Sequence, residues 1–279
     1  MKHGLDLEDA RRVIAAALAE DLRYGADATT EATVAADAVA VAELTPRVAG
    51  ALAGIPVALE AFRQVTDVEV LEQREDGDKA VPGEPALVLR GPVRGLLTAE
   101  RTALNLLCHL SGVATLTAAW VAEVEGTGAA VRDSRKTLPG LRLLEKYAVR
   151  CGGGVNHRLG LGDAVLIKDN HVRAAGSVRA AMAAVRAHAP HLECEVEVDS
   201  LDQLDEAVAE GAELVLLDNF TVADCAEAVR RVAGAVRLEA SGGLTLDVAR
   251  AYAGTGVDYL AVGGLTHSAP ALDLGLDLR

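Results

Sequence analysis

The chain has 279 residues, 51% of them hydrophobic, which is enough for one large domain or for a barrel with a smaller partner domain. Its formal net charge of −14 argues against nucleic acid or an anionic membrane as the main partner, because both require a basic surface. No signal-peptide pattern and no run of about eighteen uncharged apolar residues occurs, so we expect a cytoplasmic protein with no membrane partner.

The first part of the chain is predicted to mix helices and strands. The expected elements are helices over residues 7–22 and 55–65 and strands over 39–44 and 86–89. A long helical stretch is then expected from Thr98, a good N-cap residue, to Glu125. The pair Ser111-Gly112 predicts a break within it.

After Gly128, short β-branched runs alternate with helical segments, which is typical of parallel βα units. Strands are expected over residues 129–132, 164–167, 193–198, 214–217, 236–239 and 259–262. Six such units are the minimum for a barrel-like sheet, and an open doubly wound sheet is the alternative. Nearly every run ends in polar, chemically capable residues. In a parallel barrel these residues would converge at one mouth, which favours the barrel.

Two glycine pairs follow the last two predicted strands. They lie in Ser241-Gly242-Gly243 and in Val262-Gly263-Gly264. A glycine lets the backbone approach a phosphate, and the next helix offers free N–H groups at its N-terminus. Either pair alone would be an ordinary turn, but the two together favour a phosphate site at a position where barrels often have one.

Acidic residues recur with period two over residues 193–199, namely Glu193, Glu195, Glu197 and Asp199. In a strand they would all point to one face. A stack of carboxylates inside a barrel is costly unless cations or hydroxyls meet it. Either Mg²⁺ or a ribose diol would serve, with Asp218 joining from the next strand. The alternative is a solvated, outward-facing acidic surface, which would leave only Val196 and Val198 for the interior.

Basic residues concentrate between positions 132 and 173, where nine Lys or Arg stand against four Asp or Glu. Arg135, Arg158 and Lys168 follow or flank predicted strand ends, and Arg forks suit a ligand with adjacent carboxylates. A solvated surface position is the alternative for any single one of them. The four cysteines form no C-x-x-C pair, so we expect them to be reduced and structural.

Nine segments carry a more specific pattern: ERTALN (100–105), DSRKTLPGLR (133–142), KYAV (146–149), GGGVNHR (152–158), LIKDNH (166–171), EVEV (195–198), LDN (217–219), EASGG (239–243) and VGGLTHS (262–268). Together they resemble the quinolinate phosphoribosyltransferase family, and the resemblance extends over nearly the whole chain. The resemblance implies an α/β fold, with an N-terminal α/β sandwich domain (1–110) followed by an incomplete TIM-like α/β barrel (111–279). The last residues could pack back on the first domain.

The resemblance also implies a function. The family transfers a phosphoribosyl group from phosphoribosyl pyrophosphate (PRPP) to quinolinate with decarboxylation, giving nicotinate mononucleotide, pyrophosphate and CO₂ for NAD biosynthesis, with Mg²⁺ as cofactor. It implies a homodimer, or a higher oligomer built from it, in which Arg101 reaches the partner's site.

The resemblance assigns individual residues as well. Those implied to bind quinolinate are Arg101, Arg135, His157, Arg158 and Lys168. Lys136 and Lys168 would contact PRPP, while Glu197 and Asp218 would bind the ribose hydroxyls and Mg²⁺, directly or through water. Lys136, Lys168, Glu197 and Asp218 are the implied catalytic residues. The other implied substrate-binding residues are Ser134, Ser241, Gly242, Gly243, Val262, Gly263, Gly264 and His267.

Two alternative functions stay open at this point. A related phosphoribosyltransferase could act on nicotinate or another ring acid, although a monocarboxylate would not need the full cationic set. A non-catalytic sensor of a phosphate ligand could retain the barrel, although it would not need Lys136, Glu197 and Asp218.

Overall fold

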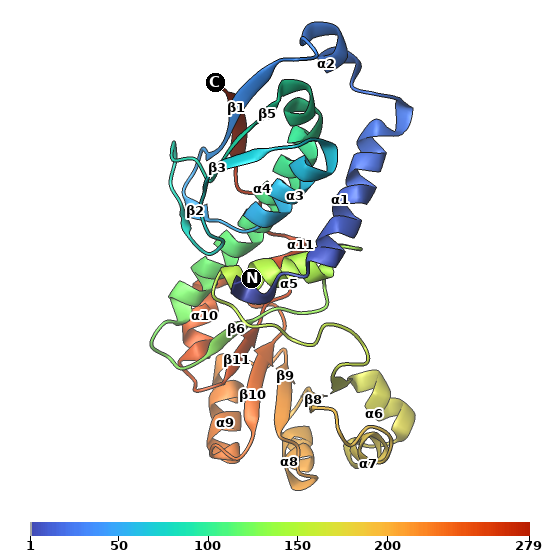
Figure 1. Cartoon of the computed structure of the whole chain (residues 1–279). Helices are drawn as coiled ribbons and strands as arrows, with labels where there is room; N and C mark the ends of the chain where they lie inside the picture. Colours follow the sequence, from blue (N-terminus) through green and yellow to red (C-terminus); the bar gives the residue numbers. More distant parts are fainter. Residues whose placement is uncertain (1) are drawn as a thin grey trace. The chain divides into compact units, whose positions relative to one another are not determined.

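The computed structural model describes residues 2–279, which form two compact units (Figure 1). The first unit comprises the described residues up to Ala118 together with Thr137–Gly153 and Gly264–Arg279. The second comprises Ala119–Lys136 and Gly154–Gly263. Each unit is thus assembled from separate stretches of chain. The expected domain boundary between residues 110 and 111 stays a prediction.

The first unit contains a four-stranded antiparallel sheet in the order β12-β1-β5-β3. These strands are β1 (Val39–Pro46), β3 (Glu69–Gln73), β5 (Leu87–Pro92) and β12 (Leu274–Leu278), and a separate pair joins β2 (Gly50–Ala51) to β4 (Lys79–Ala80). Leu44 of β1 lies opposite both Leu87 and Leu276 and is fully buried. The last strand of the chain therefore completes the sheet of the first unit.

Helices account for most of the remaining first unit. They are α1 (Leu7–Asp21), α2 (Ala28–Thr33), α3 (Ile55–Val65), α4 (Val93–Val124, of which the residues up to Ala118 belong to this unit), α5 (Arg142–Cys151) and α11 (Gly264–His267), with short 3₁₀ turns η1 (Lys2–Gly4) and η2 (Leu22–Tyr24). The start of α3 is fixed by Asp76, whose carboxylate accepts the N–H groups of Gly54 and Ile55. The predicted helix over 55–65 is confirmed at both ends.

The prediction for α4 was wrong in two respects, because the helix starts at Val93 rather than Thr98 and runs without a break. Ser111 and Gly112 serve tertiary contacts instead. The Ser111 hydroxyl accepts from Ala53 N and donates to Ala53 O. A Cβ on Gly112 would lie 2.2 Å from the carbonyl oxygen of Pro270, so the glycine permits a close approach of two chain segments.

By length and composition alone, α4 could cross a membrane. In the structure, 56% of its most apolar stretch is buried inside the protein. Its fully buried residues include Leu96, Leu107 and Val113. The apolar character of α4 is therefore accounted for by core packing.

The second unit contains a six-stranded parallel sheet in the order β6-β11-β10-β9-β8-β7. The strands are β6 (Ala130–Arg132), β7 (Val165–Ile167), β8 (Cys194–Val198), β9 (Leu214–Asp218), β10 (Arg237–Ser241) and β11 (Tyr259–Ala261). All six lie within two residues of their predicted bounds. Within residues 2–279 no pairing joins β6 to β7, so the barrel is incomplete, as expected.

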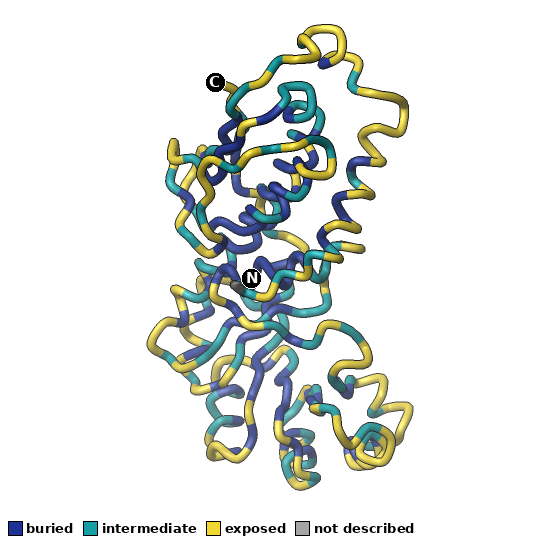
Figure 2. The backbone as a smooth tube through the Cα atoms, in the orientation of Figure 1, coloured by how far each residue is buried: buried dark blue, intermediate teal, exposed yellow. Residues whose placement is uncertain are grey.

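Burial on both faces explains why these strands are short apolar runs. Residues 214–217 of β9 are all buried, and Figure 2 shows the buried strands beside helices with exposed outer faces. The helices are α6 (Asp169–Ala175), α7 (Val178–His188), α8 (Leu201–Ala209), α9 (Val222–Val232) and α10 (Leu246–Ala253). Ser177, Ser200 and Thr221 cap α7, α8 and α9 through their side chains.

Candidate active site

Most of the predicted site residues follow the carboxyl ends of strands in the second unit. Parallel strands end at one edge of a sheet, so the loops after them share that edge. The residues at this edge are Ser134, Arg135 and Lys136 after β6, Lys168 after β7, Glu197 in β8, Asp218 at the end of β9, Ser241, Gly242 and Gly243 at β10, and Val262 and Gly263 after β11.

An acidic cavity of about 440 Å³ lies at the ends of β8 and β9. It is lined by Asp169, Val172, Arg173, Glu197, Val198, Asp199, Gln203 and Asp218. Asp218 accepts a hydrogen bond from Asn219 Nδ2 at 2.9 Å, and Glu197 Oε2 lies 2.5 Å from the ammonium of Lys168. Carboxylate oxygens can ligate Mg²⁺ and can accept hydrogen bonds from ribose hydroxyls, so the side chains present fit both.

The predicted stack of four carboxylates was only half right. β8 spans Cys194–Val198, so only Glu195 and Glu197 lie in the strand and face the interior. Glu193 and Asp199 lie outside the strand and are exposed, and Glu193 pairs with Arg237 at 2.6 Å. Each additional carboxylate inside the sheet would have needed its own counter-charge, which explains why the inward pair is limited to two.

The loop after β10 brings the backbone close to the neighbouring strand end. Asn219 has a left-handed backbone with φ 58°, and its N–H donates to Ser241 O at 2.8 Å. A Cβ on Gly242 would lie 2.2 Å from Asn219 Oδ1, and Gly242 and Gly243 have φ values of 97° and 60°. A Cβ on Gly243 would meet open space. This geometry meets the steric requirement for a backbone phosphate cradle.

Two guanidiniums form the cationic part of the edge. Arg135 and Arg158 are half-buried, and the Nε atom of each is buried with no hydrogen-bond partner among residues 2–279. Burial lowers the pKa of Arg158, and the nearby charge of Arg135 lowers it further. Two like charges held together favour a ligand with more than one negative charge.

The segment that carries Arg158 is held by Asp133, which is fully buried. The carboxylate of Asp133 accepts from Asn156 Nδ2 at 2.6 Å and from the main-chain N–H of His157 at 2.8 Å. Val155 also pairs with β6, because its N–H donates to Val131 O at 2.9 Å. The chain leading to Arg158 is therefore an extension of the sheet.

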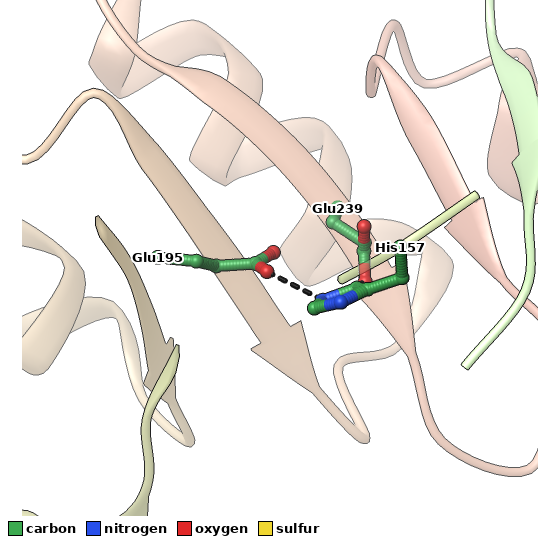
Figure 3. Close-up of side chains that lie close together, drawn as sticks. All are labelled: His157, Glu195 and Glu239. Atoms are coloured by element: carbon green, nitrogen blue, oxygen red, sulfur yellow. Dashed lines mark hydrogen bonds and ion pairs between the residues drawn. The ribbon is translucent and has the colours of Figure 1, made fainter. Parts of the chain in front are cut away.

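A buried network around His157 was not predicted as a unit (Figure 3). Its Nε2 lies 2.7 Å from Glu195 Oε2 and 3.9 Å from Glu239 Oε1, and Glu239 Oε2 accepts from Arg132 Nη1 at 2.7 Å. Burial, and then the adjacent Glu195, raise the pKa of Glu239. The one sequence signal was a glutamate inside each of two otherwise apolar strands.

Three predicted residues lie in the first unit. Arg101 is on α4 with a side chain that is 66% exposed, and it pairs only loosely with Glu100 at 4.0 Å. Gly264 begins α11 and a Cβ there would meet open space, while His267 Nδ1 lies 2.6 Å from Ser268 Oγ.

The cysteines are unpaired thiols, as expected. Burial raises the pKa of Cys151 and of Cys225 to about 12 in each case. A thiol with such a pKa stays protonated near neutral pH and is a poor nucleophile. Cys151, beside the glycine run at 152–154, is therefore structural.

Comparison with known proteins identifies the family. The family model described as "Quinolinate phosphoribosyl transferase, N-terminal domain" matches residues 27–111, and the model of the C-terminal domain matches residues 113–277. The nicotinate-nucleotide pyrophosphorylase (carboxylating) of Mycobacterium leprae is 60% identical over 279 residues, covering 98% of each chain. A protein of Bacillus subtilis named as a probable enzyme of the same kind is 41% identical, covering 85% of this chain and 83% of its own.

The solved structure of the nicotinate-nucleotide pyrophosphorylase from Francisella tularensis superposes with a TM-score of 0.95 at 39% identity, covering 99% of this chain and 98% of that one. The chain therefore belongs to the quinolinate phosphoribosyl transferase family.

Proposed function

We propose that this protein transfers the phosphoribosyl group of PRPP to quinolinate and decarboxylates the product, giving nicotinate mononucleotide, pyrophosphate and CO₂ for NAD biosynthesis. The chain belongs to this family, and one observation of its own structure supports the proposal. The same edge of the parallel sheet holds a guanidinium pair, an acidic cavity and a glycine loop. These three features are complementary to a dicarboxylate, a ribose and a phosphate respectively.

Quinolinate would bind at the cationic part of the edge. Arg135 and Arg158 offer unpartnered, buried Nε donors. Lys168 supplies an ammonium next to Glu197, which lines the acidic cavity. His157, which precedes Arg158 in the chain, and Arg101 also belong to the quinolinate-binding set that the sequence resemblance implied. Two adjacent carboxylates would satisfy both guanidiniums, whereas nicotinate would leave one of them without a counter-charge.

PRPP would bind along the rest of the edge. Glu197 and Asp218 would accept the ribose hydroxyls, and Lys136, exposed in the loop after β6, would contact the pyrophosphate. The phosphate group would lie against backbone N–H groups of the two glycine loops. The residues proposed there are Ser134, Ser241, Gly242, Gly243, Val262, Gly263, Gly264 and His267.

Mg²⁺ would be held by Glu197 and Asp218, directly or through water, and would neutralise charge on the departing pyrophosphate. The hard oxygen donors of the cavity support this assignment, since its lining contains four carboxylates and a single arginine. Asp218→Asn should raise the Mg²⁺ concentration needed for half-maximal rate about tenfold, while Asp202→Asn, a surface control on α8, should leave it unchanged. An equal Mg²⁺ requirement in both variants would remove Asp218 from the metal assignment.

The chemistry follows from these positions. The pyridine nitrogen attacks the anomeric carbon as the bond to pyrophosphate breaks, and positive charge develops on the ribose ring. Glu197 and Asp218 would stabilise that charge. The quaternary nitrogen then stabilises the electron pair left when the adjacent ring carboxylate departs as CO₂, and that carbon takes up a proton. Arg135 and Arg158 would hold the carboxylates in place throughout.

The assembly belongs to the same proposal. Arg101 would enter the site of a second copy in a homodimer or a higher oligomer, and its exposed side chain on α4 supports that role. We also propose that the enzyme acts in the cytoplasm, with no nucleic acid or membrane partner.

The direct test supplies purified protein with PRPP and Mg²⁺ and either quinolinate or nicotinate. We expect nicotinate mononucleotide from quinolinate alone, measured by chromatography. Product from nicotinate alone would transfer the function to the related phosphoribosyltransferase class. No product from either substrate, with tight binding of PRPP, would support a sensor.

A further inference from the structure

The main chain before Arg158 is fixed at successive residues. Val155 N donates to Val131 O at 2.9 Å, and Asp133 N donates to Val155 O at 3.2 Å. His157 N donates to the buried carboxylate of Asp133. The main-chain N–H of Arg158 follows, and it donates to a side-chain atom, Nδ1 of His157, at 2.7 Å. The imidazole therefore continues a series of contacts that sets the direction of the chain.

These contacts determine the protonation of the ring. A main-chain N–H can only donate, so Nδ1 of His157 must accept and carries no proton. The proton of the neutral ring is then on Nε2, which lies 2.7 Å from the Glu195 carboxylate and donates to it. An imidazolium would place a second proton at Nδ1, directly facing the N–H of Arg158.

Two carboxylates, those of Glu195 and Glu239, lie behind the ring. Arg132 offsets one of them, because its guanidinium bonds Glu239 at 2.7 Å while lying 4.7 Å from the centre of the Tyr259 ring. Burial of Glu239, which is 0% exposed, further disfavours its charged form.

We propose that Glu195, Glu239 and Arg132 form a positioning network that holds His157 as the neutral Nε2–H tautomer. In this form Nδ1 accepts the main-chain N–H of Arg158 and fixes the position of that residue's main chain. The guanidinium of Arg158 is thereby oriented toward a carboxylate of the substrate. The inference rests on the proposed function and deepens it, because it assigns His157 an indirect role in binding quinolinate. Arg158 is the residue that touches the substrate.

The same side chains could instead be ligands of a metal ion. His157, Glu195 and Glu239 each offer one ligand atom, and these atoms lie within 4.8 Å of one another. Two contacts oppose this use. Arg132 already holds Glu239, and a metal on Nε2 would move the ring proton to Nδ1, where it would conflict with the N–H of Arg158.

Two substitutions at one position separate the roles of the two ring nitrogens. In His157→Asn, the side-chain oxygen takes the place of Nδ1 and can accept from Arg158 N–H. In His157→Gln, the side-chain amide reaches the place of Nε2 but leaves that N–H without its acceptor. We expect KM for quinolinate to rise about tenfold more in the Gln variant than in the Asn variant, the cost of one unsatisfied, partly buried donor, with KM for PRPP unchanged in both. The opposite order would mean that Nε2 contacts the substrate, and would overturn the proposal.

A measurement on the unmodified protein tests the tautomer without relying on activity or on a folded variant. In ¹⁵N–¹H correlation spectra, the His157 ring should show a proton on Nε2 and none on Nδ1, with the signal assigned by its loss in His157→Asn. A Nδ1–H or imidazolium pattern would overturn the proposal, as would loss of the Nε2 proton on adding one equivalent of Zn²⁺. If the wild-type protein makes no product from quinolinate, the proposed function fails, while these spectra still decide the tautomer.

Discussion

At the scale of single residues, Glu239 is a carboxylate whose surroundings are set entirely by the fold. It is fully buried and faces Arg132, Glu195 and His157. The sequence shows only a glutamate near the end of a short apolar run, and nothing in that run indicates which charges surround it. The Arg135 and Arg158 pair could be predicted, because both residues flank strand ends. The burial and missing partners of their Nε atoms could not, since these depend on segments distant in the chain.

Stability should depend on pH through Glu239. Its pKa in the folded protein is raised to about 7 from an ordinary value of 4.5, so the folded state binds the proton more tightly than the unfolded state. The associated stability is therefore present below about pH 4.5 and is lost as the pH rises to about 7. In Glu239→Gln this loss is absent. Relative to wild type, the variant should gain on the order of 2 kcal/mol in unfolding free energy between pH 5 and pH 8, measured by urea titration. If the difference in unfolding free energy between the variant and the wild type stayed constant from pH 5 to pH 8, the pKa of Glu239 would not be raised.

Among the helices and strands, the predicted and observed bounds agree where the sequence pattern that predicts the element is local. The six parallel strands are short apolar runs bounded by turn residues, so their positions were predicted to within two residues. The break expected in α4 was wrong because Ser111 and Gly112 have local propensities that tertiary contacts override. Two acids too many were predicted to point inward from β8, because the strand begins at Cys194, one residue later than predicted, and Asp199 lies beyond its last residue.

Gly112→Ala tests the close contact made by α4. Alanine favours a helix by about 1 kcal/mol over glycine, so propensity alone predicts a gain in stability. The new Cβ would lie 2.2 Å from the Pro270 carbonyl oxygen, and we expect a net loss of about 2 kcal/mol in unfolding free energy. Ala119→Gly, at an exposed position of the same helix, provides the reference for propensity and should lose about 1 kcal/mol. A stabilised Gly112→Ala protein would show that the contact is loose.

At the scale of the whole molecule, the proposed sharing of sites between copies makes Arg101 and Lys136 separable. Arg101→Ala and Lys136→Ala should each be nearly inactive while remaining folded. When equal amounts are unfolded and refolded together, half of the dimers would be mixed and one site in each would be intact, so about a quarter of wild-type activity should return. Mixing Lys136→Ala with Glu197→Gln is the control, because both changes lie in the second unit and should restore nothing. If neither mixture recovered activity, Arg101 would not contribute to a partner's site.

In the proposed reaction, one site couples phosphoribosyl transfer to decarboxylation of a pyridine dicarboxylate. The most direct measurement supplies quinolinate labelled with ¹³C in the 2-carboxyl group, together with PRPP and Mg²⁺, and follows the label by NMR alongside pyrophosphate. We predict that labelled CO₂, pyrophosphate and nicotinate mononucleotide appear in equal amounts, and that all three fall together in Lys136→Ala. Pyrophosphate release with the label retained in the ring product, or no reaction of quinolinate at all, would contradict this coupling.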